Sequence, residues 1–324
     1  MNGEISPALF WGLAGLVLVL IAAAASGITA LVLLRKSKSA PKPAPEAGES
    51  LSVQVGKLHA QGAREGQQDC FSVSPEDLWE THGLLAVVAD GMGGLENGDQ
   101  VSQTAVSAVI NSFFSLPTEM EPQRQLLTLL QSANGAVNYL LGPERVGQCG
   151  STLVAGLLKK DAFSFLSVGD SRVCLFRDGV LVQLNREHIY RRELELRAVN
   201  GEGTLEEAAS HPRASGLTSY LGMGQIRGVD QPDQPVRIQP GDRFLLMSDG
   251  VYNALTSEEL CGALSLDAQE AADAIGEMVE SRAWPGQDNY TAVIIQYGSS
   301  KTDKVGEKHD SARGLFRCRR KRGK

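Results

Sequence analysis

The chain has 324 residues, enough to bury the core of one large domain or of two small ones. Its net charge of −7 hides an asymmetry, because residues 299–324 hold ten Lys and Arg against three Asp and Glu, so that the rest of the chain carries −14. An acidic body argues against a nucleic-acid-binding core and suits a site that collects metal cations. The five cysteines lie far apart without a C-x-x-C pair, which predicts reduced thiols in a cytosolic environment.

The first apolar segment of the chain is long enough to cross a membrane. Residues 8–34 are 27 in number without one charged side chain, and roughly 20 residues suffice for a helix across a bilayer. A buried core helix and a cleaved signal peptide are the alternatives, but no Lys or Arg precedes the run and it exceeds the apolar length of a signal peptide. We therefore expect a transmembrane helix. Arg35, Lys36 and Lys38 follow at once, which predicts that residues 1–7 are extracytoplasmic and that the remainder lies in the cytoplasm.

The rest of the chain divides into a linker, one domain and a tail. Residues 35–50 are rich in Pro, Ala and Ser, a composition that favours an extended linker. From residue 51 to 298, strand-like apolar runs alternate with amphipathic helical stretches, which indicates one folded domain. Residues 299–324 are polar and basic, and we expect them to be disordered. Beside a membrane anchor, contact of this tail with anionic lipid is favoured over nucleic acid.

Short apolar or β-branched runs within the domain predict strands, and longer amphipathic stretches predict helices. In chain order, the expected strands cover residues 84–89, 163–168, 173–176, 244–247 and 291–296. The expected helices cover residues 98–115, 123–141, 256–264 and 267–282.

Several predicted strands end at a carboxylate. Asp90, Asp170 and Asp249 each follow an apolar run and precede a small residue, and Asp288 stands just before the last strand. A carboxylate at the end of a buried strand is unfavourable unless it is neutralised, so several at one sheet edge indicate bound cations. No His or Cys is placed to join them, so the oxygen ligands favour Mg²⁺ or Mn²⁺ over Zn²⁺. A turn residue explains each Asp taken alone, but it explains the four together poorly.

Two further features join this set. The chain turns on glycines directly after Asp90, which makes the Gly91 carbonyl a candidate metal ligand. Upstream, Arg64 stands five residues before Asp69, and its guanidinium is suited to a bidentate grip on a phosphate.

Eight sequence blocks in a fixed order resemble the type-2C metal-dependent protein phosphatases, particularly their bacterial branch. They are G-x-R-x-x-Q-Q-D from Gly62, VVADGMGG, GSTLV, VGDSR, Leu184-Asn185 with His188, LTSYLG, PGDRFLLMSDG and QDNYTAV, and they span nearly all of residues 52–297. The resemblance implies an α+β fold: a four-layer αββα sandwich of two antiparallel sheets flanked by helices, with the metals in a cleft at one end of the sheets.

The resemblance also implies a role for each metal ligand. Asp90 matches the acid that bridges two metal ions, and Gly91 matches the carbonyl ligand beside it. Asp249 and Asp288 match the ligands that complete the shell of the other metal. Asp69 matches the outer-shell acid of the first block.

Two more residues match, and two positions depart from the family pattern. Arg64 matches the phosphate-binding arginine, and Asp170 matches the acid of a third, weaker metal site. Gln68 stands where the family commonly has a glutamate, which predicts lower metal affinity. Met92 stands where many eukaryotic members carry a histidine proposed as general acid. Residues 189–217 correspond to a flap beside the site.

These residues predict a mechanism and a function. Two cations sharing Asp90 are expected to activate a water for in-line attack on phosphorus, while Arg64 neutralises the phosphoryl oxygens. The predicted function is hydrolysis of phosphoserine and phosphothreonine on proteins, opposing a serine/threonine kinase at the cell membrane. A catalytically silent phosphatase fold that binds a kinase or scaffold is the alternative, and a phosphatase for small phosphorylated metabolites remains open. The expected partners are phosphoproteins, a kinase and membrane lipid, and no nucleic acid.

Overall fold

The computed structural model describes residues 52–92 and 98–298 of the chain. The predicted transmembrane segment 8–34, the linker 35–50 and the tail 299–324 lie outside these residues. No helix within the described ranges combines the length and the apolar character that a membrane span requires.

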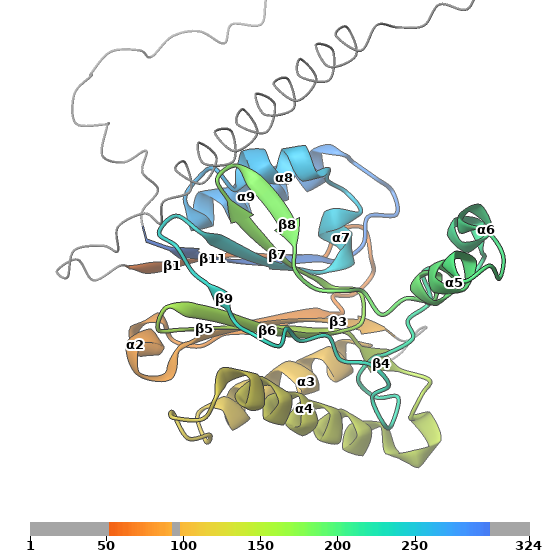
Figure 1. The fold of residues 1–324 in the computed structure, drawn as a ribbon, viewed down its shortest axis with the longest axis horizontal. Helices are drawn as coiled ribbons and strands as arrows, with labels where there is room; N and C mark the ends of the chain where they lie inside the picture. Colours follow the sequence, from red (N-terminus) through yellow and green to blue (C-terminus); the bar gives the residue numbers. More distant parts are fainter. Residues whose placement is uncertain (1–51, 93–97, 299–324) are drawn as a thin grey trace, which may run out of the picture. The chain divides into compact units, whose positions relative to one another are not determined.

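Two antiparallel sheets face each other at the centre of the domain (Figure 1). The first has the strand order β1 (Val53–Ala60), β11 (Tyr290–Tyr297), β10 (Arg243–Met247), β7 (Arg172–Arg177) and β8 (Val180–Gln183). The second has the order β2 (Asp69–Val73), β3 (Leu84–Met92), β5 (Leu153–Lys159), β6 (Ala162–Val168) and β9 (Val236–Arg237), and β4 (Gly150–Ser151) also pairs with β3.

Helices cover the outer face of each sheet, which gives the layer order helix, sheet, sheet, helix (Figure 1). The second sheet is covered by α3 (Gly98–Phe113) and α4 (Pro122–Arg145), and the first by α8 (Ser257–Ala263) and α9 (Ala268–Ser281). The other helical segments are η1 (Glu76–Leu78), α2 (Trp79–His82), α5 (Tyr190–Val199), α6 (Leu205–Ser210) and α7 (Asp249–Tyr252). The predicted sandwich of two antiparallel sheets and flanking helices is confirmed.

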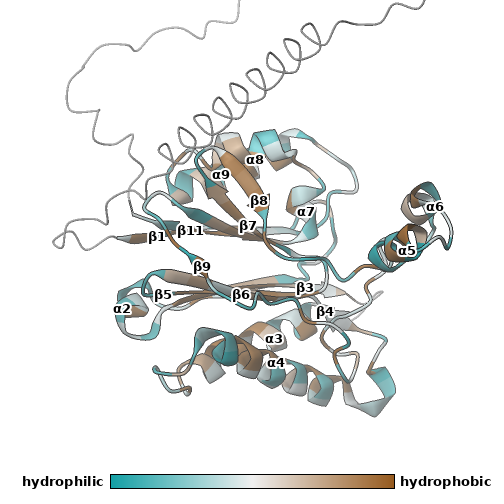
Figure 2. Ribbon diagram, in the orientation of Figure 1, coloured by the Kyte–Doolittle hydropathy of each residue, from teal (hydrophilic) through white to brown (hydrophobic). Residues whose placement is uncertain are grey.

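Strand β3 shows how the sequence specifies these layers. Successive side chains of a strand point to opposite faces of the sheet, and both faces of β3 are buried. One set of alternate residues faces α3 and α4 and the other faces the first sheet: Leu85, Val87 and Ala89, and Leu84, Ala86 and Val88, respectively. Between the sheets, the rings of Phe163 and Phe244 stack with their centroids 3.8 Å apart. The strands are therefore mainly hydrophobic and the connecting loops mainly hydrophilic (Figure 2).

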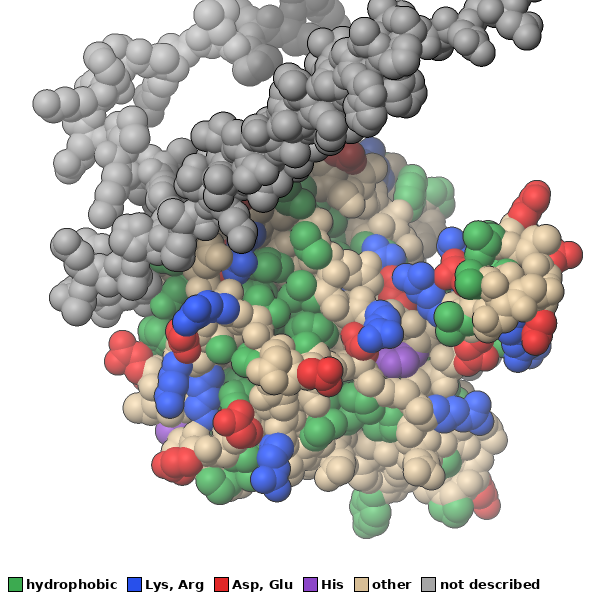
Figure 3. Space-filling view, in the orientation of Figure 1, with side chains coloured by type: hydrophobic (Ala, Val, Ile, Leu, Met, Phe, Trp, Pro, Cys, Tyr) green, Lys and Arg blue, Asp and Glu red, His purple; other side chains and the backbone are tan. Residues whose placement is uncertain are grey.

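The chain leaves the sandwich between β8 and β9 as a flap, which comprises residues 189–217. Ile189 and Leu217 pair in an antiparallel bridge, so the two ends of the flap are adjacent. Helix α5 has no buried residue, and in α6 only Ala208 is buried. The flap extends away from the layers and carries intermixed acidic and basic side chains (Figure 1, Figure 3).

The five predicted strands and four predicted helices are all present, with small shifts at their ends. Helix α4 differs most, because it was expected to end at residue 141 and continues to Arg145. Gly142 has φ 65° and interrupts the helical conformation, and Pro143 begins a further short turn. The predicted end therefore coincides with a real break in the helix.

Candidate active site

The register of the second sheet places two carboxylates opposite each other. Asp69 begins β2 and pairs directly with Asp90 of β3. The Cβ atoms of such a pair lie about 5 Å apart, a separation at which like charges repel. The hydroxyl of Ser248 donates to Oδ2 of Asp69 at 2.7 Å. Asp69 is only 3% exposed, yet its Oδ1 has no hydrogen-bond partner among the described residues.

Three more carboxylates lie at the same end of the sandwich. Asp249 is the first residue of α7, directly after β10. Asp170 lies in the turn between β6 and β7, and Asp288 lies two residues before β11. Asp90 is repelled electrostatically by Asp69, Asp249, Asp170 and Asp288, so the five groups form one cluster.

Burial and mutual repulsion disfavour the charged forms of four of these carboxylates. Burial is the larger cause and raises the pKa of Asp90 well above its ordinary value, and the neighbouring carboxylates raise it further. Burial likewise raises the pKa of Asp69 to about 6 and that of Asp170 to about 7. The pKa of Asp249 is raised by burial and by the charge of Asp288. A cation among these groups would favour their charged forms.

Arg64 supplies positive charge at the edge of this cluster. Its Nε donates to Oδ1 of Asp288 at 2.8 Å, and its Nη2 donates to Oδ2 at 2.7 Å. The hydrogen bond from Arg64 to Asp288 and the carboxylate charge raise the pKa of the guanidinium. The Arg64 side chain is 58% exposed, so it is accessible to a ligand. Sequence reasoning placed both residues in the site but missed their contact.

Asn289 fastens the β1–β2 loop, which carries Arg64. Its Nδ2 donates to the carbonyl oxygens of Gln61 at 2.7 Å and of Gly66 at 2.9 Å, and its Oδ1 accepts from the backbone N–H of Gln68 at 2.8 Å. One buried amide therefore ties both ends of the loop to the segment before β11. Sequence reasoning missed this role, although a polar residue directly before an apolar strand was a visible signal.

Gly91 lies where two backbone segments come very close together. A Cβ atom at this position would lie 2.1 Å from the carbonyl oxygen of Gly98. The N–H of Gly91 donates to the carbonyl of Gln68 at 3.0 Å. A larger residue would push α3 away from β3, so glycine keeps the backbone beside Asp90 in place. The effect of Gln68 on metal affinity stays a prediction.

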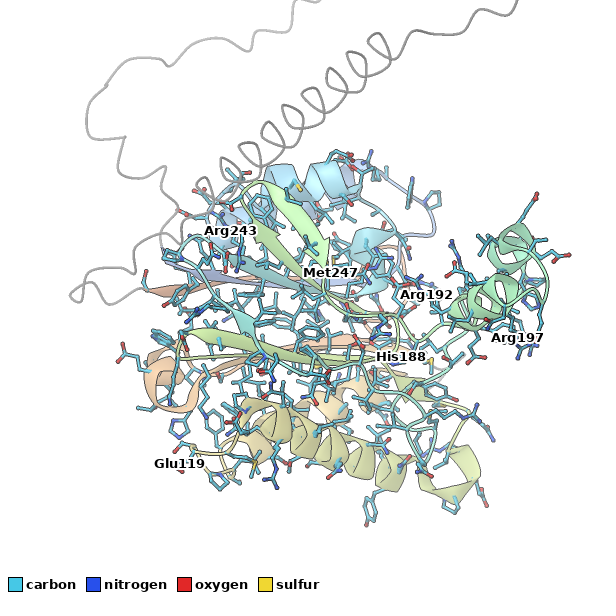
Figure 4. All side chains as sticks on the ribbon, viewed as in Figure 1. Glu119, His188, Arg192, Arg197, Arg243 and Met247 are labelled. Carbon is cyan, nitrogen blue, oxygen red and sulfur yellow. The ribbon has the colours of Figure 1, made fainter. Side chains whose placement is uncertain are left out.

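Polar contacts link Asp170 to the start of the flap. The hydroxyl of Tyr252 donates to the carbonyl of Asp170 at 3.3 Å, and the guanidinium carbon of Arg172 lies 3.5 Å from the centre of the Tyr252 ring. Nε of Arg172 donates to the carboxylate of Glu187 at 2.6 Å. His188 follows, and its backbone N–H donates at 2.8 Å to the carbonyl of the residue before Asp170. Figure 4 shows His188 at the end of the sheets from which the flap extends.

The chemistry of the donor set fits a hard divalent cation. The candidate metal-ligating side chains are carboxylates, whose oxygens Mg²⁺ and Mn²⁺ prefer as ligands. One of these oxygens, the buried Oδ1 of Asp69, has no hydrogen-bond partner among the described residues. Within residues 52–92 and 98–298, no three carboxylate, imidazole or thiol groups already stand at metal-ligand spacing. The individual ligand assignments stay predictions.

Comparison with known proteins identifies the family. The family model described as protein phosphatase 2C matches residues 56–281, which include most of both sheets and the flap. This chain belongs to the protein phosphatase 2C family. Four of the five clustered carboxylates lie within the matched residues, and Asp288 follows just beyond them.

Curated relatives in this phosphatase family cover most of the domain. The serine/threonine phosphatase stp of Listeria monocytogenes is 32% identical over 216 residues, which are 65% of this chain and 84% of the relative. The serine/threonine protein phosphatase PstP of Mycobacterium tuberculosis is 30% identical over 241 residues, which are 71% of this chain and 44% of the relative.

Solved structures share the fold of this family member. The phosphatase MsPP of Mycobacterium smegmatis, in complex with cacodylate, has a TM-score of 0.62 at 31% identity and covers 76% of this chain and 100% of its own. The catalytic domain of PstP in complex with two manganese ions has a TM-score of 0.61 at 26% identity and covers 77% and 100%. The second structure supports metal dependence in this family.

The raised pKa of Asp170 predicts how stability depends on pH when metal is chelated. Its pKa is about 7 in the folded protein against about 4 in an unfolded chain, so between these two values ionisation of the unfolded chain disfavours folding. The contribution of this carboxyl to stability is therefore fully present below about pH 4 and is lost as pH rises from about 4 to about 7. We expect Asp170→Asn to be more stable than wild type at pH 8, by about 1 kcal/mol or more, and the difference to shrink as pH falls towards about 4.

Thermal melts across this pH range, with a chelator present, measure the difference. Burial lowers the pKa of His59 and His188 and gives the opposite pH slope, so the comparison must be between variant and wild type. Asp161→Asn is the matched control, because Asp161 is exposed and precedes the other end of β6. A stability difference between Asp170→Asn and wild type that did not grow with pH would contradict the assignment.

Proposed function

We propose that this chain is a metal-dependent phosphatase that hydrolyses phosphoserine and phosphothreonine in proteins. The observation that carries the proposal is the cluster of five carboxylates at one end of the sandwich, with an exposed arginine at its edge. Such a cluster suits divalent cations, and the arginine suits a phosphate ester. The serine/threonine phosphatases among its relatives support the same substrate class.

We assign two cations, Mn²⁺ or Mg²⁺, to residues of this cluster. Asp90 is the shared ligand, Asp249 and Asp288 are further side-chain ligands, and the Gly91 carbonyl is a backbone ligand. Asp69 supports Asp90 from the neighbouring strand. When bound, the cations supply an activated water and neutralise phosphoryl charge. Asp170 is assigned to a third, weaker site.

Arg64 orients the phosphate in this proposal. Its guanidinium offers parallel N–H donors that match two phosphoryl oxygens. Asp288 and the loop fastened by Asn289 hold the side chain at the cleft before substrate binds. A group held in place in this way loses little conformational entropy when substrate binds.

The full-length protein, purified in mild detergent with Mn²⁺, should hydrolyse phosphothreonine peptides and stop in excess chelator. Asp90→Asn should lower kcat/KM about a hundredfold or more, because it removes the ligand assigned to both cations. Asp161→Asn, an exposed acid outside the cluster, should retain wild-type activity.

Three outcomes of this assay would contradict the proposal. Equal activity in excess chelator would exclude metal-dependent hydrolysis. Binding of Mn²⁺ by calorimetry without hydrolysis of any phosphate ester would favour the catalytically silent binding module. Hydrolysis confined to small phosphorylated metabolites would place the substrate in another class.

Arg64→Ala should raise KM and lower kcat for phosphopeptides without weakening Mn²⁺ binding. The variant loses the phosphate grip, while Asp288 loses only an exposed ion pair of small energetic value. Arg64→Lys keeps the positive charge but not the two parallel N–H donors, so its KM and kcat should lie between those of Arg64→Ala and wild type. Peptide kinetics and calorimetric titration with Mn²⁺ separate the two effects, and a large loss of Mn²⁺ affinity in Arg64→Ala would disprove the assignment.

We further propose that the enzyme is anchored in the cell membrane with its domain in the cytoplasm, opposing a serine/threonine kinase. The uncharged segment 8–34 and the basic residues after it support this placement, and the basic tail 299–324 supports a second contact with anionic lipid. Protease added to intact cells should leave the domain undigested. Digestion without lysis would refute the orientation, and full-length protein in the soluble fraction would refute the anchor.

A further inference from the structure

A pocket of about 390 Å³ lies beside the candidate active site. One wall is the β1–β2 loop from Gln61 to Ala63, directly before Arg64, and the other is the end of α9 with the segment that follows it. Gly62 in this loop has φ 62°, and a Cβ atom there would lie 2.3 Å from the carbonyl oxygen of Asp288. The backbone of this loop is therefore held against the segment that contains Asp288. Arg64 is the next residue after the part of the loop that lines the pocket.

The pocket has an aromatic wall that is open to solvent. Trp284 lines it and is 48% exposed, an unusual state for so large an aromatic side chain. Ala283 has φ 49°, a left-handed conformation that ends the helical stretch and turns the chain towards β11. The face of an indole ring attracts cations, and it does so more strongly than the rings of Tyr or Phe.

The same pocket carries an uncompensated negative charge. Glu280 lines it and is exposed, and no salt bridge of the described part of the chain involves Glu280. Its carboxylate accepts one long hydrogen bond, from the hydroxyl of Tyr290 at 3.4 Å. The nearby basic residues are occupied, because Arg64 pairs with Asp288 and Arg282 pairs with Glu259. A cationic guest is therefore complementary to the pocket.

A mostly buried glutamine forms another part of the wall. Gln287 lines the pocket and is 8% exposed, and its Nε2 donates to the carbonyl of Gly250 at 2.9 Å. Its Oε1 has no hydrogen-bond partner among the described residues. A guanidinium brings several N–H donors and stacks on an aromatic face, so it matches the Trp284 ring and the Glu280 carboxylate together. An acidic side chain would be repelled by Glu280, and an aliphatic one would desolvate it without compensation.

We propose that this pocket binds an arginine or lysine side chain of the substrate protein, close in sequence to the phosphorylated residue. The proposal rests on the proposed function, since Arg64 would hold the phosphate on one side of the loop while the pocket holds the basic side chain on the other. The enzyme would thus prefer phosphorylation sites flanked by basic residues.

Phosphothreonine peptides that differ in one flanking residue test the preference. The full-length protein with Mn²⁺ is assayed on peptides with Arg, Leu or Glu at each position within about three residues of the phosphothreonine, which is roughly 10 Å of extended chain. At one position, kcat/KM should be about tenfold higher with Arg than with Leu, and lowest with Glu. An absence of dependence on the flanking charge, or a preference for Leu or Glu, would overturn the proposal.

Variants locate the preference in the pocket. Trp284→Ala and Glu280→Gln should each reduce the ratio of kcat/KM for the Arg and Leu peptides to about twofold or less, mainly through KM. Glu277→Gln is the matched control, because Glu277 is an exposed acid one turn earlier on α9 that does not line the pocket. Melting temperatures verify that each variant folds. A ratio that stays at the wild-type value in Trp284→Ala and Glu280→Gln would exclude this pocket as the site.

The two proposals fail in different ways. If the wild-type protein with Mn²⁺ hydrolyses neither p-nitrophenyl phosphate nor any phosphopeptide, both are overturned. If it hydrolyses phosphopeptides without regard to flanking charge, the proposed function stands and the pocket proposal alone is overturned.

Discussion

Repulsion among five partly or fully buried carboxylates is the constraint around which this domain is organised. Burial and neighbouring charges raise the pKa of four of them, Asp69, Asp90, Asp170 and Asp249, and Asp69 and Asp90 stand directly opposite each other on paired strands. An isolated loop would relax by moving such groups apart. Here each lies in or beside an element that ends at the same end of the sandwich and is packed into a core elsewhere, so the sandwich keeps the charges together.

The packing that resists this repulsion comes from three hydrophobic layers. One lies between the two sheets, and one lies between each sheet and its helices. Their close packing makes small displacements of strands unfavourable. Around the cleft, hydrogen bonds also restrain the charged groups, because Asn289 holds the loop of Arg64 and Ser248 holds Asp69. The charged groups are thus positioned before any ligand binds, which is the condition for electrostatic stabilisation of a reacting phosphate.

Much of this arrangement can be predicted from the sequence, because local patterns carry it. The uninterrupted apolar run of β3 indicates a strand buried on both faces, and the carboxylates that follow such runs indicate a shared edge. The pairing of β1 with β11, whose partners lie more than two hundred residues apart, has no local signal of this kind. The same holds for the pair of Arg64 with Asp288 and for the three hydrogen bonds of Asn289. These contacts depend on where the fold brings distant segments, and composition or periodicity does not encode that directly.

The helices of the flap bury far less side-chain surface than the elements of the sandwich, which affects the substitutions that they can accept. Its two helices bury a single residue, Ala208, while Leu196 and Val199 are 67% and 76% exposed. Substitutions there remove almost no packing, so selection for folding places few demands on these positions. Selection for recognition can act on them instead. The exposed positions of the flap can therefore accept substitutions that the buried positions of the sandwich cannot accept without a loss of packing.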